Sequence, residues 1–238
     1  MTLHRDVFAN HAALAQALAE RLDGWGAEAQ QGQGRFRLSV AGGNTPRALY
    51  PVWATHSRLD WERVDLLFGD ERCVPPQHRD SNYRMVREAL LEQAPIPPRV
   101  WRMPGEQADP DAAAAAYEAT LHTLLGPAGR IDVALLGMGG DGHTASLFPH
   151  AAALGEQTRW CVATPAPDGR TMRLTLTYPL LCRARRLVFL ITGSDKAATL
   201  ARVVQGPADA DTLPAQRLLR EATGDIHLLL DEAAAGLA

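Results

Sequence analysis

The sequence predicts an α/β fold in which helices cover a mostly parallel sheet. Short apolar runs alternate with helical periods along nearly the whole 238-residue chain, as repeated strand–helix–strand units require. Two of these runs, 131–137 and 187–192, are almost continuously apolar, which is typical of strands buried on both faces of a parallel sheet. We expect right-handed crossovers between successive parallel strands.

In the N-terminal part, apolar residues at helical spacing predict a first helix that ends before a surface loop at 31–34. Strands are predicted at 35–41, 64–68 and 100–103. A helix that begins near Pro46 is expected to be kinked or short, because Pro51 would clash with the carbonyl of Arg47. The apolar face of the first helix consists of Leu14, Leu18, Leu22 and Trp25.

Capping residues mark three further helix starts. Ser81 can cap one helix, Asp109 and Pro110 suit the N-cap and first position of the next, and Ser194 can cap a third. Strand 131–137 is predicted to be central, and 226–230 is predicted to be the last strand before an alanine-rich terminal helix, with a surface loop at 206–211. With no internal repeat and no long linker, we expect residues 1–238 to form a single domain.

The charge balance argues against partners that need a strong basic field. There are 24 Lys and Arg residues against 27 Asp and Glu residues, a net charge of −3, so we expect neither nucleic acid nor membrane as a partner. Cys73, Cys161 and Cys182 are too far apart for a Cys-x-x-Cys pair, which favours reduced thiols and no metal site. The first residues lack the pattern of a signal peptide, so we expect a cytoplasmic protein.

Ligands of open α/β sheets bind beyond the carboxyl ends of the strands, so the residues after each predicted strand are candidate site residues. The first such segment is Gly42-Gly43-Asn44-Thr45, which leads into a helix start. Glycines let backbone N–H groups approach an anion, and the helix N-terminus adds a favourable partial charge, so this segment suits a phosphate. An ordinary capped turn explains the segment by itself equally well.

Charged residues stand at other predicted strand and helix ends. Asp70 and Arg72 follow the strand at 64–68 and suit polar recognition or acid–base chemistry, although a solvated charge cluster explains them equally well. Arg173 and Lys196 offer a planar fork and a point charge for a phosphate, although each alone is more often a surface charge. Their convergence with the glycine segment favours a phosphate site.

The segment 137–146 directly follows the predicted central strand. It contains G-x-G-x-x-G, but the fingerprint of dinucleotide binding needs an acid about 20 residues later, and Glu156 and Asp168 fit that spacing poorly. Asp141 stands two residues before His143, which is better explained as a carboxylate that orients an imidazole for proton transfer. Ser146 lacks the strand–turn–helix setting of a nucleophile elbow and is expected to be structural.

Several segments together resemble the 6-phosphogluconolactonase family. The resemblance rests on 41–46, on 69–75 with 80–82, and on 173–177 and 193–196, which follow in the family's order. It covers essentially the whole chain and implies a three-layer, Rossmann-like sandwich, a fold shared with glucosamine-6-phosphate deaminases. Its most specific part is Asp141-Gly142-His143-Thr144-Ala145-Ser146-Leu147-Phe148-Pro149.

The resemblance implies hydrolysis of 6-phospho-D-glucono-1,5-lactone to 6-phosphogluconate, the second step of the oxidative pentose phosphate pathway, without a cofactor. The resemblance makes His143 the general base that activates water, with Asp141 orienting the His143 imidazole. It places Asp70 and Arg72 at the end of the site that binds the sugar and the carbonyl. We expect this small-molecule lactone to be the partner of the chain. We also expect the chain to be a monomer or a weak homo-oligomer. The residues implied to hold the phosphate are Gly42, Gly43, Asn44, Thr45, Arg173 and Lys196.

Asn44 stands where the family usually has serine, and its amide can still donate and accept hydrogen bonds. An aminosugar-phosphate deaminase or isomerase is the main alternative, but that family carries Asn-Glu-Pro where this chain has Leu147-Phe148-Pro149, which favours the lactonase. A non-catalytic sugar-phosphate sensor is a third interpretation. Such modules usually accompany a DNA-binding or partner domain, for which 238 residues leave no room.

Overall fold

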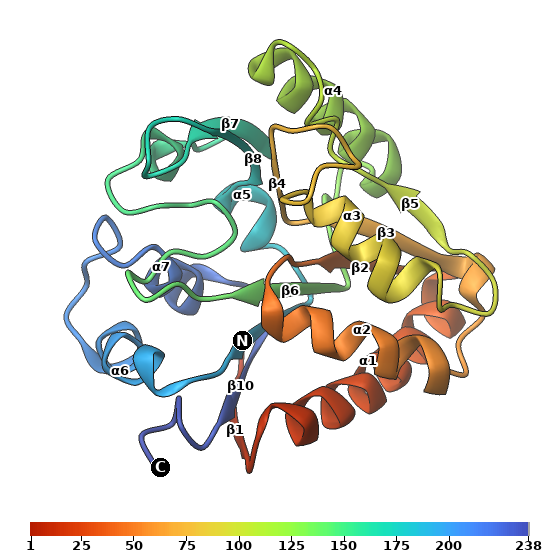
Figure 1. Ribbon diagram of the computed structural model, residues 1–238, viewed down its shortest axis with the longest axis horizontal. Coiled ribbons are helices and arrows are strands. Elements are labelled where there is room, and N and C mark those ends of the chain that lie inside the picture. The colour runs from red at the N-terminus through yellow and green to blue at the C-terminus, as the bar shows by residue number, and fades with distance from the viewer. Residues whose placement is uncertain (238) are drawn as a thin grey trace.

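The computed structural model describes residues 1–237, in which a seven-stranded sheet forms the middle layer (Figure 1). Its strands lie in the order β1-β10-β9-β6-β2-β3-β5, and every neighbouring pair is parallel. The predicted α/β class and mostly parallel sheet are therefore confirmed, and β6 is the central strand as expected. The strands are β1 (Leu3–Phe8), β2 (Phe36–Val40), β3 (Val64–Phe68), β5 (Arg99–Trp101), β6 (Val133–Gly137), β9 (Arg186–Ile191) and β10 (Asp225–Asp231).

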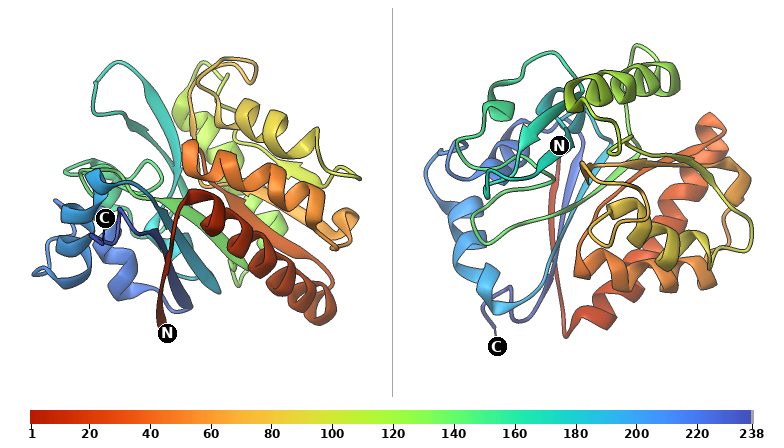
Figure 2. Two further views of the ribbon diagram at one scale, coloured as in Figure 1. Left: turned by 60° about the horizontal axis from the view of Figure 1, so that its bottom comes forward. Right: turned by 45° about the horizontal axis from the view of Figure 1, so that its top comes forward.

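Helices cover both faces of this sheet, which gives the three layers (Figure 2). On one face α1 packs along α2, and α2 contacts α3 and the π-helical turn 87–91 that follows it. Helices α6 and α7 lie on the other face, and α4 packs against a second, smaller sheet. The helices are α1 (His11–Gln33), α2 (Asn44–His56), α3 (Asn82–Val86), α4 (Pro110–Leu125), α5 (Tyr178–Leu181), α6 (Ala197–Gln205) and α7 (Pro214–Glu221).

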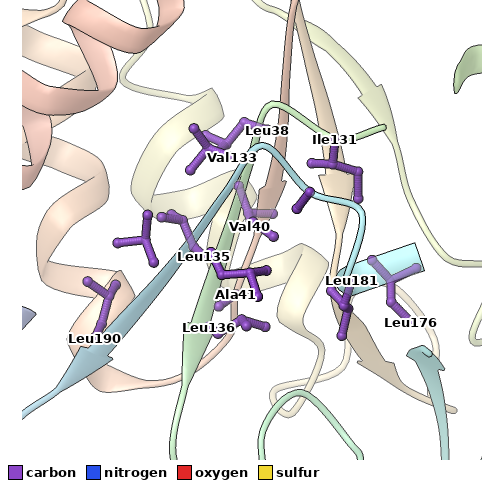
Figure 3. Close-up of a cluster of buried hydrophobic side chains, with 14 of the residues drawn as sticks. Leu38, Val40, Ala41, Ile131, Val133, Leu135, Leu136, Leu176, Leu181 and Leu190 are labelled. Carbon is purple, nitrogen blue, oxygen red and sulfur yellow. The ribbon is translucent and has the colours of Figure 1, made fainter. Parts of the chain in front are cut away.

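The core lies around the central strands, whose side chains are buried on both faces (Figure 3). β3 has all five residues buried, and Val133, Leu135 and Leu136 of β6 are each no more than 1% exposed. Burying one such side chain stabilises the fold by roughly 1.5–3 kcal/mol, so this apolar layer holds the strand ends in fixed positions. The loops that follow these strands therefore start from a rigid edge.

The second sheet is antiparallel and was not predicted. It contains β4 (Asp70–Arg72), β8 (Met172–Leu176) and β7 (Cys161–Pro165), in that order. The segment after β3 was expected to be a loop, but 70–72 pair with 173–175 of β8. Because β4 is only three residues long and all three of them are charged, no apolar pattern marks it as a strand. Two of the expected site residues, Asp70 and Arg72, are thus held by strand pairing.

Three local predictions are wrong, and a fourth is wrong in one of its two alternatives. The loop at 31–34 is helical up to Gln33, and α1 is capped by Gly34, whose φ is +88°. The helix near Pro46 was expected to be kinked or short, and it is not short, because α2 runs for 13 residues with Pro51 inside it. Ser194 does not cap α6: its side chain makes no capping bond, and a 3₁₀ turn at 194–196 precedes the helix. The predicted terminal helix is instead a run of turns at 232–236, where the Asp231 carboxylate accepts the Ala234 N–H at 2.7 Å.

The predictions of two helix caps, one loop and two strands are confirmed. Ser81 caps α3 and accepts the Arg84 N–H, while Asp109 caps α4 with Pro110 in its first turn. Residues 206–211 form a loop between α6 and α7, and the strands at 64–68 and 226–230 are present. Cys73, Cys161 and Cys182 are free thiols. Within residues 1–237, no helix combines the length and apolarity needed to cross a membrane.

Candidate active site

A cavity of about 250 Å³ lies beyond the carboxyl ends of β2, β3, β6 and β9. Each of these strands contributes its following segment to the lining, which includes Gly43, Asp70, His143 and Lys196. All four strands are parallel, so their carboxyl ends meet at one edge of the sheet, where open α/β folds bind ligands. Residues far apart in the sequence are therefore brought to one cavity.

His143 and Asp141 form a close pair in the loop after β6. The His143 Nδ1 lies 2.6 Å from Asp141 Oδ1, which also accepts the His143 backbone N–H at 3.1 Å. Although partial burial acts to raise it, the pKa of Asp141 is lowered overall, by the hydrogen bonds from His143 and by the charge of its ring. A proton on Nδ1 is fixed by this carboxylate, so the lone pair of Nε2 is available to accept a proton.

Gly139 allows this pair to form. A Cβ at position 139 would lie 2.1 Å from His143 Nδ1 and 2.5 Å from Asp141 Oδ1, distances that real Cβ atoms essentially never show. The loop is also closed by the Gly139 N–H, which donates to the His143 carbonyl at 2.9 Å. The imidazole thus packs directly against the glycine backbone, and its other ring neighbour is Phe148, at 4.9 Å between ring centroids.

Asp70 is held from two sides. Its Oδ2 accepts the Ser146 hydroxyl at 2.7 Å, and its Oδ1 accepts the Asn82 side-chain amide at 3.2 Å. The same amide donates to the Asp70 carbonyl at 2.9 Å. Asn82 also explains Gly42, because a Cβ there would lie 2.0 Å from the Asn82 Oδ1.

The neighbouring Glu71 is structural. It is 3% exposed, and its carboxylate accepts the backbone N–H groups of Arg72, Asn82 and Tyr83 as well as the Ser81 hydroxyl. Burial raises the pKa of Glu71, and the three backbone N–H donors oppose that rise. Glu71 thereby joins β4 to the start of α3 and fixes the backbone on either side of Asp70.

The glycine segment forms the start of α2. Gly43 is the N-cap, with φ at +102°, and no side chain caps the helix, so its first N–H groups lack a capping side chain. Thr45 does not cap the helix; its hydroxyl lies 2.8 Å from the Thr192 hydroxyl, which follows β9. This contact joins the segment after β2 to the segment that carries Lys196.

Lys196 and Arg173 line different cavities. Lys196 Nζ contacts Asp195 at 2.7 Å and lines the first cavity. Arg173 lines a second cavity of about 290 Å³, which shares Asp70, Arg72 and His143 with the first. Arg173 pairs in register with Arg72, and burial followed by the Arg72 charge lowers the pKa of its guanidinium. The expected site residues thus surround His143, but Lys196 and Arg173 do not line one common cavity.

Sequence reasoning missed two contributors. Ser81-Asn82 suggested only a helix cap, and Ser146 was expected to be structural, yet both Asn82 and Ser146 bond to the Asp70 carboxylate. Their partners lie 12 and 76 residues away, so no local pattern could reveal them. Among residues 1–237, no group of three or more His, Cys, Asp or Glu side chains is arranged to hold a metal ion.

Comparison with known proteins decides the family. The sequence pattern of the family described as glucosamine-6-phosphate isomerases/6-phosphogluconolactonase matches residues 9–228. The chain belongs to this family. It is 42% identical over 211 residues to a 6-phosphogluconolactonase of Synechocystis sp., covering 87% of this chain and 85% of that relative.

Solved structures agree with this family assignment. A 6-phosphogluconolactonase from Trypanosoma cruzi is similar with a TM-score of 0.86 and 28% identity, covering 99% of this chain and 97% of the other. A monomeric glucosamine-6-phosphate deaminase is similar with a TM-score of 0.83 but only 19% identity, covering 100% of both chains. The second likeness shows the fold alone, so the fold is common to both activities and the choice between them depends on the site.

Proposed function

We propose that this family member hydrolyses 6-phospho-D-glucono-1,5-lactone to 6-phosphogluconate. The observation that carries the proposal is the 2.6 Å contact between His143 Nδ1 and Asp141, at a cavity that Lys196 and the glycine segment also line. Hydrolysis of a lactone, which is an ester, needs a base for the attacking water and stabilisation of the developing charge, and this arrangement offers an imidazole for the first and a cation for the second. The named 6-phosphogluconolactonase relatives support the same activity.

In the proposed mechanism His143 acts as the general base. Its Nε2 takes a proton from a water molecule while the water oxygen attacks C1 of the lactone, and Asp141 stabilises the imidazolium that forms. The tetrahedral intermediate then collapses and the bond between C1 and the ring oxygen breaks. The ring oxygen receives the proton from the imidazolium and leaves as the hydroxyl on C5. One water is consumed, and the product is the open-chain acid.

The phosphate is proposed to lie at the start of α2. Gly42, Gly43, Asn44 and Thr45 bring backbone N–H groups and the positive end of the helix dipole to an anion, and Lys196 supplies a full charge from the same cavity. Arg173 is proposed as a further phosphate ligand. It reaches the substrate from the second cavity, which the shared His143 joins to the first.

Asp70 and Arg72 are proposed to line the sugar and carbonyl end, because both border the two cavities beside His143. The Asp70 carboxylate can accept hydrogen bonds from ring hydroxyls. Arg72 adds positive charge either to the oxyanion or to a ring hydroxyl, and kinetics separate these roles. Loss of an oxyanion contact lowers kcat, whereas loss of uniform substrate binding raises KM with kcat unchanged.

The site also favours the lactonase over the deaminase. Deaminases of the family carry an acid at the position of Phe148, and this aromatic ring packs instead against the His143 imidazole and lines the second cavity. Leu147 beside it is fully buried. We also propose that residues 1–238 act as one domain, since β1 and β10, from opposite ends of the chain, are neighbours in the main sheet.

The test is a direct comparison of three substrates on the purified protein. Hydrolysis of fresh 6-phosphogluconolactone is measured with correction for spontaneous ring opening, beside unphosphorylated gluconolactone and ammonia release from glucosamine 6-phosphate. The proposal expects rapid, phosphate-dependent lactone hydrolysis without ammonia. Ammonia release without lactonase activity would support the deaminase, and inactivity on all three substrates would support a non-catalytic sensor.

A further inference from the structure

We infer that Ser146 and Asn82 are positioning residues that fix the Asp70 carboxylate relative to His143 and the glycine segment. This inference rests on the proposed function and assigns a role to Asn82, which lines the first cavity, and to Ser146, which lines the second. Ser146 and Asn82 are 1% and 2% exposed, so neither side chain is held in place by water. Each bonds to a different oxygen of the Asp70 carboxylate.

Ser146 links Asp70 to the loop that carries His143. Its hydroxyl donates to Asp70 Oδ2 at 2.7 Å, while its own backbone N–H donates to the Thr175 hydroxyl at 3.1 Å. Because Ser146 follows His143 by only three residues, this contact sets the position of the carboxylate relative to the imidazole. A buried hydrogen bond to a charged group is among the stronger ones, so the carboxylate has little freedom to rotate.

Ala145 shows that the chain is bent to make this contact. Its φ is +48°, in the left-handed region that non-glycine residues rarely adopt. The residue before it, Thr144, is fixed by its hydroxyl bond to the Gly137 carbonyl at 2.8 Å, and Leu147 N–H donates back to the Thr144 carbonyl at 2.9 Å. Such backbone conformations persist where surrounding contacts hold them in place. Here the conformation of Ala145 turns Ser146 toward Asp70.

Asn82 links Asp70 to the glycine segment. Its amide nitrogen serves both the Asp70 carbonyl and Oδ1, and its amide oxygen occupies the space that a Cβ of residue 42 would need. The backbone N–H of Asn82 is held by Glu71 at 2.7 Å, so the amide is fixed at its base as well. Asn82 therefore sets the spacing between the proposed phosphate end and the proposed sugar end of the site.

The test is a double-mutant cycle on the whole protein, with Ser146→Ala, Asp70→Ala and the double variant. If Ser146 acts through Asp70, Ser146→Ala lowers kcat/KM about 10-fold in the wild-type background, in the range of lost supporting contacts around functional groups. In the Asp70→Ala background, which has no acceptor for the Ser146 hydroxyl, the same change should alter kcat/KM by less than about 2-fold, because coupled residues are not additive. Equal losses in both backgrounds would overturn the inference.

Thr144→Val is the matched control. Thr144 is 1% exposed like Ser146 and lies in the same loop, but its hydroxyl bonds to the Gly137 carbonyl and not to Asp70. Its effect on kcat/KM should be the same in the wild-type and in the Asp70→Ala background. A purely structural role for Ser146 predicts that it behaves like Thr144 in the cycle.

Asn82→Asp tests the other contact without changing side-chain shape. A carboxylate in place of the amide loses the donor to Asp70 and adds a like charge, so kcat/KM should fall about 100-fold or more, as for a misplaced catalytic group. Unchanged kcat/KM would exclude a positioning role for Asn82. Thermal unfolding of each variant shows whether it folds, and Ser146→Cys, a nearly isosteric weak donor, should recover part of the activity lost in Ser146→Ala.

Failure of the proposed function is distinguishable from failure of this inference. A wild-type protein that does not hydrolyse the lactone refutes the function, whereas an active wild type with an additive cycle refutes the inference alone. In the first case urea unfolding of the same four proteins still measures the coupling between Ser146 and Asp70. Zero coupling there would refute the contact, and with it the positioning role.

Discussion

Gly139→Ala adds one methyl group at the place where the candidate site has no room for it. The new Cβ would lie 2.1 Å from His143 Nδ1, and ordinary van der Waals contact begins near 3.4 Å. The imidazole must therefore move by about 1 Å, and a misplacement of that size lowers a catalysed rate by roughly 100-fold. Asp141 Oδ1, at 2.5 Å from the same Cβ, must move as well, so the His143–Asp141 contact is disturbed from both sides.

The expected result is a kcat about 100-fold lower with a nearly unchanged KM, because the atoms nearest the new Cβ belong to His143 and Asp141 and not to a proposed phosphate ligand. The assay follows acid release from 6-phosphogluconolactone with a pH indicator, corrected for spontaneous ring opening. Gly140→Ala is the control, since residue 140 is exposed and its Cβ would meet only Lys196 Nζ, at an ordinary 3.7 Å. A Gly139→Ala protein with kcat within about 2-fold of wild type would refute the assignment of His143 as the base.

Five further substitutions test other parts of the site and the fold. His143→Ala should lower kcat by about 100-fold to 10,000-fold, the usual contribution of a general base, with a much smaller change in KM. Lys196→Ala and Arg173→Ala should each raise KM for the phosphorylated lactone by roughly 10-fold, as expected for one hydrogen bond to a charged group, while the rate on unphosphorylated gluconolactone stays the same. The pKa of Asp141 lies below its ordinary value of 3.8, so Asp141 stabilises the folded state above that pH and loses this effect as the pH falls through its lower folded pKa. In urea unfolding, the wild type should therefore have a higher free energy of unfolding than Asp141→Asn at pH 7. This difference should disappear as the pH falls below about 3.8. Burial, followed by the charge of His4, lowers the pKa of His227 from 6.5 to about 4, so the unfolded chain binds the extra proton and stability falls as the pH falls between these values. In His227→Gln, the free energy of unfolding should decrease less over this pH range.

The strands of the main sheet could be predicted where burial is complete. The runs at 64–68 and 133–137 are apolar except for Asp65 because both faces of the sheet are covered, and this pattern is visible in the sequence. The edge strand β1 has four exposed residues out of six, so its composition does not distinguish it from a loop. Gly26 illustrates the same limit for α1, since its missing side chain makes room for Leu59, a contact that tertiary packing alone creates.

The contacts of the candidate site also divide into those that the sequence can predict and those that it cannot. Asp141 and His143 are two residues apart in one loop, so their contact could be predicted from the sequence, and the 2.6 Å distance confirms it. Arg72 and Arg173 are paired in an antiparallel sheet although they lie 101 positions apart in the sequence, so the sequence could not show that these two guanidinium groups are neighbours. Sequence reasoning finds local pairs, and it misses contacts that only the packing of distant segments creates.

The glycines of the loop after β6 show why their spacing misleads as a fingerprint. In a dinucleotide site the G-x-G-x-x-G glycines admit a pyrophosphate. Here Gly139 admits the His143 imidazole, while Gly142, with φ at +82°, lies against Leu213, which a Cβ would approach to 2.7 Å. The Gly142 carbonyl also accepts the Ala215 N–H at 2.9 Å, so α7 supports the loop from behind. The glycines are therefore explained by protein contacts that place the His143 imidazole at the cavity, and not by room for a pyrophosphate.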